Sequence, residues 1–154
     1  MKTTFSLNGQ QVSVDTDAGD MLLHALRDEL HLTSVRGTCG IGLCGTCTVI
    51  VDDKTTASCL IPVPMIAGAD IRTIEGIGND PVLQAFEDAQ AFQCGFCTPA
   101  MILTTQQLLV ENPAPSDDEI DAALAGNLCR CGCYFKIRDA AKLAATALAQ
   151  RSGA

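Results

Sequence analysis

The sequence contains no tryptophan and only one tyrosine, so few side chains are available for stacking on nucleic-acid bases. Its 10 lysine and arginine residues are outnumbered by 18 aspartate and glutamate residues, which gives a formal net charge of −8. An acidic chain repels a phosphate backbone, and solubility is the simpler explanation of its negative charge. These shortages argue against nucleic-acid binding.

The sequence also lacks an apolar run long enough to cross a bilayer, and no signal-peptide segment or twin-arginine motif follows Met1. We therefore expect no membrane span and a cytoplasmic location. What the chain has in abundance is cysteine, with nine residues in 154. Cytosolic thiols stay reduced, and an odd number cannot pair completely, so a disulfide framework is not expected. Ligation of a metal or metal cluster is the leading explanation.

The first half of the chain has the pattern of a sheet with one helix. Apolar and polar residues alternate on both sides of Asn8-Gly9, which predicts a β-hairpin. A helix is expected at residues 21–30, with Asp20 as its N-cap. Further strands are expected at residues 48–51, 55–60 and 71–74.

The second half has the pattern of a helical domain. Helices are expected to begin near Pro81, Pro99, Ser116 and Phe135, the third with a capping box and the last ending near residue 150. Residues 76–80 are the expected boundary, which predicts domains at residues 1–76 and 77–154. Four cysteines precede this boundary and five follow it, so each domain can hold a site of its own.

The first cysteine set has the spacing C-x4-C-x2-C followed by a distant cysteine, which is typical of plant-type ferredoxins. Its members are Cys39, Cys44, Cys47 and Cys59. Four glycines among residues 37–45 allow the loop to curl around a 2Fe–2S cluster, and Cys59 is expected to arrive from a neighbouring strand. The alternative is a structural zinc site, although zinc sites usually pair two C-x2-C knuckles.

The second set combines C-x2-C, at Cys94 and Cys97, with C-x-C, at Cys129 and Cys131. Both pairs precede expected helices, whose free amides and positive dipole ends stabilise anionic sulfur. Neither pair completes a four-ligand site alone. From spacing, zinc and iron are both open, and a thioredoxin-type dithiol would leave the C-x-C pair unexplained.

Three segments together resemble the iron–sulfur subunit of the xanthine oxidase family of molybdenum hydroxylases. They are Cys39–Cys59 with its glycines, Gln93-Cys94-Gly95-Phe96-Cys97-Thr98-Pro99 and Gly126-Asn127-Leu128-Cys129-Arg130-Cys131. The resemblance implies an α+β fold, with an N-terminal plant-type ferredoxin-like β-grasp domain followed by a C-terminal four-helix 2Fe–2S domain. It also implies that the second set, like the first, binds a 2Fe–2S cluster.

The same resemblance implies a function as the non-catalytic electron-transfer subunit of an oxidoreductase. A large partner subunit would hold a molybdopterin, as the cytosine dinucleotide, and would hydroxylate an N-heteroaromatic compound or an aldehyde. The inner cluster, on Cys94, Cys97, Cys129 and Cys131, would lie nearer the molybdenum, and Gln93 would contact the pterin. The outer cluster, on Cys39, Cys44, Cys47 and Cys59, would pass electrons to an acceptor such as a cytochrome or FAD subunit.

The sequence departs from the family pattern at two positions. Ala100 stands where glycine is common, and Cys133 follows Gly132 where members with a flavin subunit commonly have Thr-Gly. The second departure favours the isoquinoline 1-oxidoreductase type and a cytochrome acceptor. Cys133 is expected not to be a ligand, because four other thiols already complete the site. Two alternatives remain: a free ferredoxin-like carrier, which would need only the first half, and a zinc-stabilised interaction module.

Overall fold

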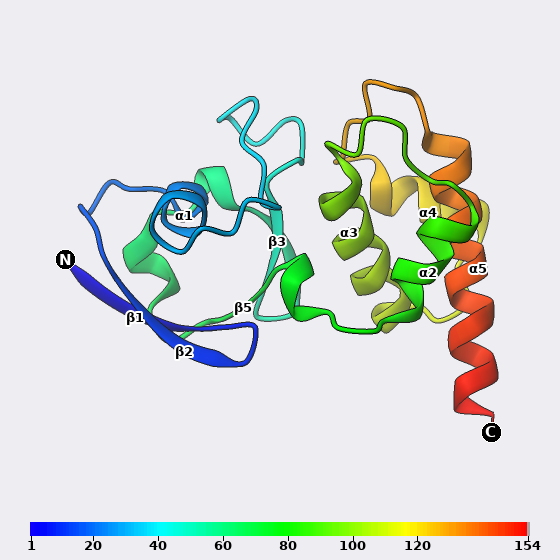
Figure 1. The fold of residues 1–154 in the computed structure, drawn as a ribbon, viewed down its shortest axis with the longest axis horizontal. Coiled ribbons are helices and arrows are strands. Elements are labelled where there is room, and N and C mark those ends of the chain that lie inside the picture. The colour runs from blue at the N-terminus through cyan, green and yellow to red at the C-terminus, as the bar shows by residue number, and fades with distance from the viewer. Residues whose placement is uncertain (154) are drawn as a thin grey trace.

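A computed structural model describes residues 1–153 and contains one mixed five-stranded sheet, in the order β2-β1-β5-β3-β4 (Figure 1). The strands are β1 (Lys2–Leu7), β2 (Gln10–Asp15), β3 (Thr48–Val51), β4 (Lys54–Ala57) and β5 (Asp70–Arg72). β1 and β5 are parallel, and the other neighbours are antiparallel. Asn8 and Gly9 both have positive φ, at 51° and 79°, which confirms the expected hairpin turn.

The expected helix over the sheet is present, as α1 (Leu22–His24) continued by a π-helical turn at Ala25–Glu29. Its leucines Leu22 and Leu26 are fully buried against sheet residues, which forms the first hydrophobic core. The prediction that Asp20 caps this helix was wrong. The N-cap is Met21, and the Asp20 carboxylate accepts a hydrogen bond from the N–H of Asp17 in the preceding turn instead.

Two strands end earlier than expected, and side chains take part in the backbone hydrogen bonds where they end. After Ala57 the chain enters a 3-10 turn at Ser58–Leu60, where both the N–H and the hydroxyl of Ser58 donate to the carbonyl of Cys47. After β5, the N–H of Thr73 donates to the Asn8 side chain at 2.8 Å. Cys59 therefore lies on a 3-10 turn and not on a strand.

The second half is the expected four-helix domain. Its helices are α2 (Pro81–Asp88), α3 (Thr98–Glu111), α4 (Asp117–Leu124) and α5 (Tyr134–Ser152). The capping box between Ser116 and Glu119 is present, and α5 runs slightly beyond its expected bounds at both ends. A second hydrophobic core, with Phe86, Met101 and Ile137, joins these helices. No helix among residues 1–153 is long and apolar enough to cross a membrane.

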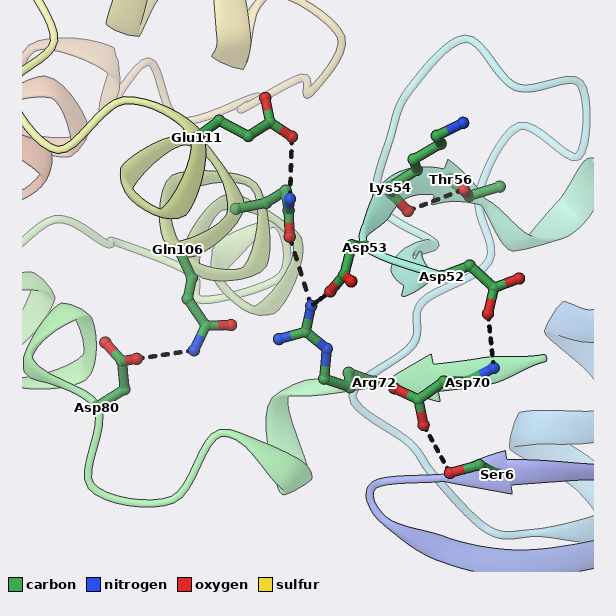
Figure 2. A network of polar contacts seen from close by, with 11 residues as sticks. Ser6, Asp52, Asp53, Lys54, Thr56, Asp70, Arg72, Asp80, Gln106 and Glu111 are labelled. Carbon is green, nitrogen blue, oxygen red and sulfur yellow. Dashed lines mark hydrogen bonds and ion pairs between the residues drawn. The ribbon is translucent and has the colours of Figure 1, made fainter.

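The halves meet where α3 packs beside β3 and β4 (Figure 1). Away from the cysteines, Arg72 bridges this junction by donating to Asp53 at 2.6 Å and to Gln107 of α3 at 3.5 Å (Figure 2). Ile74 packs against the helical core although it precedes residue 76. The division into residues 1–76 and 77–154 stays a prediction.

Candidate metal centres

Three thiols of the first set lie on one loop between the α1 region and β3, and the fourth lies on the 3-10 turn after β4. Cys44, Cys47 and Cys59 are buried, whereas Cys39 is half-buried. The curl of this loop requires glycine at position 45, which has φ +67° and lies where a Cβ atom would collide with the Gly126 carbonyl oxygen. Gly40 and Gly42 also have positive φ, as the predicted curl requires, whereas Gly37 does not.

Backbone amides of the loop point at sulfur. The N–H groups of Ile41 and Cys44 lie 3.5 and 3.4 Å from the Cys39 sulfur. These donors lower the pKa of Cys39 to about 6, which favours the thiolate that a metal requires. The loop thus provides the amide-to-sulfur contacts that a bound iron–sulfur cluster uses.

Burial has the opposite effect on the pKa of Cys59, the fourth thiol of the first set. Desolvation, followed by a hydrogen bond with the Cys47 thiol, raises the pKa of Cys59 to about 11. A buried thiol with this environment stays protonated unless a metal takes the place of its proton. Among the other thiols of the set, Cys44 acts most on Cys39 and Cys47 acts most on Cys59, which groups the four thiols two by two.

The second set is assembled from two loops, each of which leads into a helix. Cys97 is the N-cap of α3, and Cys129 and Cys131 lie in the loop before α5. Cys97 and Cys129 are buried, whereas Cys94 and Cys131 are exposed. In Figure 1, the two loops stand at the same edge of the molecule as the loop of the first set.

These thiols also lie in two pairs. The backbone N–H of Phe96, followed by the Cys131 thiol, lowers the pKa of Cys94. Burial, followed by a hydrogen bond with Cys129, raises the pKa of Cys97 to about 12. The pairs are therefore Cys94 with Cys131 and Cys97 with Cys129, each joining one loop to the other.

Pairing bears on which group the two sets can hold. Among residues 1–153, no three His, Cys, Asp or Glu side chains are grouped closely enough to hold a single metal ion. A structural zinc ion gathers four ligands at one point, whereas a 2Fe–2S cluster divides four thiolates between two irons. The amides directed at sulfur and the two pairs of thiols in each set fit the two irons of such a cluster.

A cavity of about 520 Å³ lies between the two sets. Its lining includes Cys44 of the first set together with Cys97 and Cys129 of the second. Beside it, the N–H of Leu128 donates to the carbonyl oxygen of Cys44 at 2.9 Å. This bond connects Cys44 of the first set to Leu128, the residue directly before Cys129 of the second set.

Sequence reasoning missed the side chains that support the second set. The Tyr134 hydroxyl accepts a hydrogen bond from the N–H of Cys129 at 2.8 Å. Arg36, from the first half, stacks over the Phe96 ring with 5.0 Å to its centroid. Asn127 is buried between the halves. Arg36 and Asn127 have partners far along the chain, which a local pattern cannot signal. Tyr134 lies only five residues after Cys129, so its place behind the C-x-C pair could have signalled its role.

Three residues that the sequence analysis singled out occupy different environments. Gln93 is exposed beside Cys94, and Ala100 is buried in the first turn of α3. Cys133 is half-buried, caps α5 and directs its own N–H toward the Cys129 sulfur at 3.4 Å. That Cys133 is not a ligand stays a prediction.

Comparison with known proteins agrees with this geometry. Residues 5–68 match the 2Fe-2S iron-sulfur cluster binding domain, and residues 73–142 match the [2Fe-2S] binding domain. The chain is 46% identical to a nicotinate dehydrogenase subunit of Pseudomonas putida, covering 94% of this chain and 96% of that protein. It is 40% identical to the alpha subunit of isoquinoline 1-oxidoreductase from Brevundimonas diminuta, with 92% and 95% covered. The chain belongs to the iron–sulfur subunits of the xanthine oxidase family of molybdenum hydroxylases.

A solved structure extends the likeness to the whole fold. A chain of quinoline 2-oxidoreductase from Pseudomonas putida 86 superposes with a TM-score of 0.93 at 35% identity, covering 97% of this chain and 96% of that one. This confirms the predicted order of a ferredoxin-like domain and a four-helix 2Fe–2S domain. As an iron–sulfur subunit of this family, the chain serves electron transfer within an oxidoreductase that has a large catalytic partner.

Proposed function

We propose that Cys39, Cys44, Cys47 and Cys59 hold the outer 2Fe–2S cluster, and that Cys94, Cys97, Cys129 and Cys131 hold the inner one. The observation that carries the proposal is the convergence of eight thiols into two sets, each arranged as two pairs. In each set, one pair would bind one iron and the other pair the second iron.

Each bound cluster supplies a one-electron redox couple, and the residues of this chain set its surroundings. Amides of the loop around Cys39 face sulfur and stabilise its negative charge. The start of α3 places its free N–H groups near Cys97. Because α3 also packs beside β3, the two halves that carry the sites are in contact within one chain.

The exposed face of the second set is the proposed docking surface of the molybdopterin subunit. Cys94 and Cys131 are exposed, and the exposed apolar side chains of Phe96 and Leu128 line the cavity beside Cys94 and Cys129. Exposed apolar groups around a redox site are typical of a protein interface. Gln93 lies on this face, where its amide can donate to and accept from a pterin, which we propose to be a cytosine dinucleotide form.

The proposed reaction of the partner removes two electrons from a substrate carbon, which takes its hydroxyl oxygen from water and releases two protons. The electrons would leave singly through the inner and then the outer site. The relatives named for nicotinate, isoquinoline and quinoline favour an N-heteroaromatic substrate over an aldehyde. The Gly132-Cys133 sequence favours a cytochrome acceptor over an FAD subunit. The cytoplasm is the proposed location, because cysteines stay available as metal ligands in a reducing compartment.

The experiment is purification of the native complex under anaerobic conditions, with mass spectrometry of every chain that accompanies this one. A large chain, molybdenum and a pterin are expected, and N-heteroaromatic compounds should bleach the iron–sulfur absorbance where aldehydes do not. Isolation of the native chain alone, with both clusters and no partner, would restore the free-carrier alternative.

A further inference from the structure

Asn127 lies where the loop that carries Cys129 contacts the loop that carries Cys44. Its side chain is buried, with 5% exposed, although asparagine is usually a surface residue. The amide nitrogen donates to the carbonyl oxygen of Gly45 at 2.9 Å and lies 3.2 Å from the Thr48 hydroxyl. The amide oxygen accepts from the hydroxyl of Thr104 at 3.1 Å. Both polar atoms of the side chain are thus used: the nitrogen bonds across the junction to the first half, and the oxygen bonds to α3 in its own half.

Asn127 and its partners belong to three segments that carry or adjoin cysteines. Gly45 lies between Cys44 and Cys47, Thr104 lies on the helix that begins after Cys97, and Asn127 itself is two residues before Cys129. Gly45 has no room for a side chain, because a Cβ atom would collide with the Gly126 carbonyl. The next residue, Leu128, donates its N–H to the Cys44 carbonyl at 2.9 Å.

We propose that Asn127 is a positioning residue that sets the separation of the two iron–sulfur sites and holds the Leu128–Cys44 hydrogen bond between them. The inference rests on the proposed ligand sets, but it concerns their mutual placement and not ligation itself. A buried side chain with every donor and acceptor satisfied admits few alternative arrangements. Loss of its amide leaves the Gly45 carbonyl with fewer donors and Thr104 without its acceptor.

The Arg72–Gln107 contact provides a matched control. It also joins the sheet to α3 through a buried amide side chain, but it lies among Asp53 and Glu111, away from the cysteines (Figure 2). Gln107→Ala should therefore weaken the junction without changing the separation of the two sites. If the two halves merely loosened, Asn127→Ala and Gln107→Ala would change the separation of the sites equally. If Asn127 positions the sites, only Asn127→Ala changes it.

The experiment uses the complete complex with Asn127→Ala, Thr104→Val or Gln107→Ala. Iron content and the two EPR signals of the reduced protein show whether both clusters are retained. The magnetic interaction between the clusters, seen as extra splitting when both are reduced, reports their separation. Hydrogen exchange of residues 126–128, followed by mass spectrometry, reports the Leu128–Cys44 bond.

We expect Asn127→Ala to keep both clusters, to change the magnetic splitting and to speed exchange of this segment about tenfold or more. Thr104→Val should cause the same changes more weakly, and Gln107→Ala should leave the splitting unchanged. If Asn127→Ala does not retain both clusters, the magnetic splitting and hydrogen exchange of Thr104→Val test the inference in its place. Unchanged splitting, or an equal change in Gln107→Ala, overturns the inference. Wild-type protein with fewer than two clusters overturns the proposed function instead.

Discussion

The two cysteine sets differ in how much of their enclosure comes from this chain. The first takes three thiols from one loop, and three of its four thiols are buried. The second takes its thiols from two loops, and Cys94 and Cys131 are exposed. The first site is therefore wrapped by its own chain, whereas the second is half open. The open side is where another subunit would complete the enclosure.

The sharpest way to break this comparison is to remove one exposed thiol of the second set. Cys131→Ser should lose the inner cluster and reduce iron from about four to about two atoms per chain. Cys133→Ser should retain about four, because its thiol is not needed as a ligand. Iron analysis and EPR of the reduced protein distinguish the two variants, and reversed behaviour would refute the ligand assignment in this loop.

The two hydrophobic cores offer a second comparison. Phe86 in the helical core and Phe5 in the sheet core are each 1% exposed. Truncation of either to alanine should reduce the free energy of unfolding by about 3–5 kcal/mol. Hydrogen exchange should show Phe86→Ala opening the helical half first and Phe5→Ala opening the sheet half first. Simultaneous opening of both halves in both variants would mean that the two cores unfold as one unit.

A third prediction concerns the open side of the second site. Gln93→Ala should retain both clusters but weaken molybdopterin retention by about 1–3 kcal/mol, since it would leave a buried pterin group unpaired in the complex. Molybdenum content and the rate of cluster reduction after substrate addition are the measurements. Gln11→Ala, an exposed residue of β2, is the control. Values equal to wild type for Gln93→Ala would make it an ordinary surface residue.

The smallest expected effect lies in the connection between the halves. Burial alone would raise the pKa of Glu75, but hydrogen bonds from Thr73 and Ser34 outweigh it and lower that pKa below its ordinary value. A lowered pKa stabilises the fold above the ordinary pKa, and this contribution disappears as pH falls through the lowered value. Glu75→Gln should therefore be less stable at neutral pH and lose less stability on acidification. Denaturant unfolding between pH 7 and pH 3 provides the measurement, and parallel curves for both proteins would contradict it.

Local patterns predicted most of the secondary structure. Asn8-Gly9 specified a hairpin, and Ser116 with Glu119 specified a helix start, because both signals act within four residues. The end of β4 could not be predicted in this way, since it depends on hydrogen bonds from Ser58 to Cys47, which lies directly before β3. The π-helical turn after His24 likewise has no local signal.

The same distinction applies to the candidate sites. The spacing of Cys39, Cys44 and Cys47 predicted the first site from one loop. The second site joins Cys94 to Cys131 and Cys97 to Cys129, so only the resemblance favoured iron over zinc there. Asn127 contacts Gly45 across 82 positions, and no period or motif in a single sequence reveals such a contact.

The central claim is that both sets hold a 2Fe–2S cluster. Its most direct test is metal analysis of the anaerobically purified protein, combined with low-temperature EPR after reduction. The account predicts about four irons per chain, no zinc and two distinct rhombic S = 1/2 signals. One signal with about two irons, or a stoichiometric zinc ion, would contradict it.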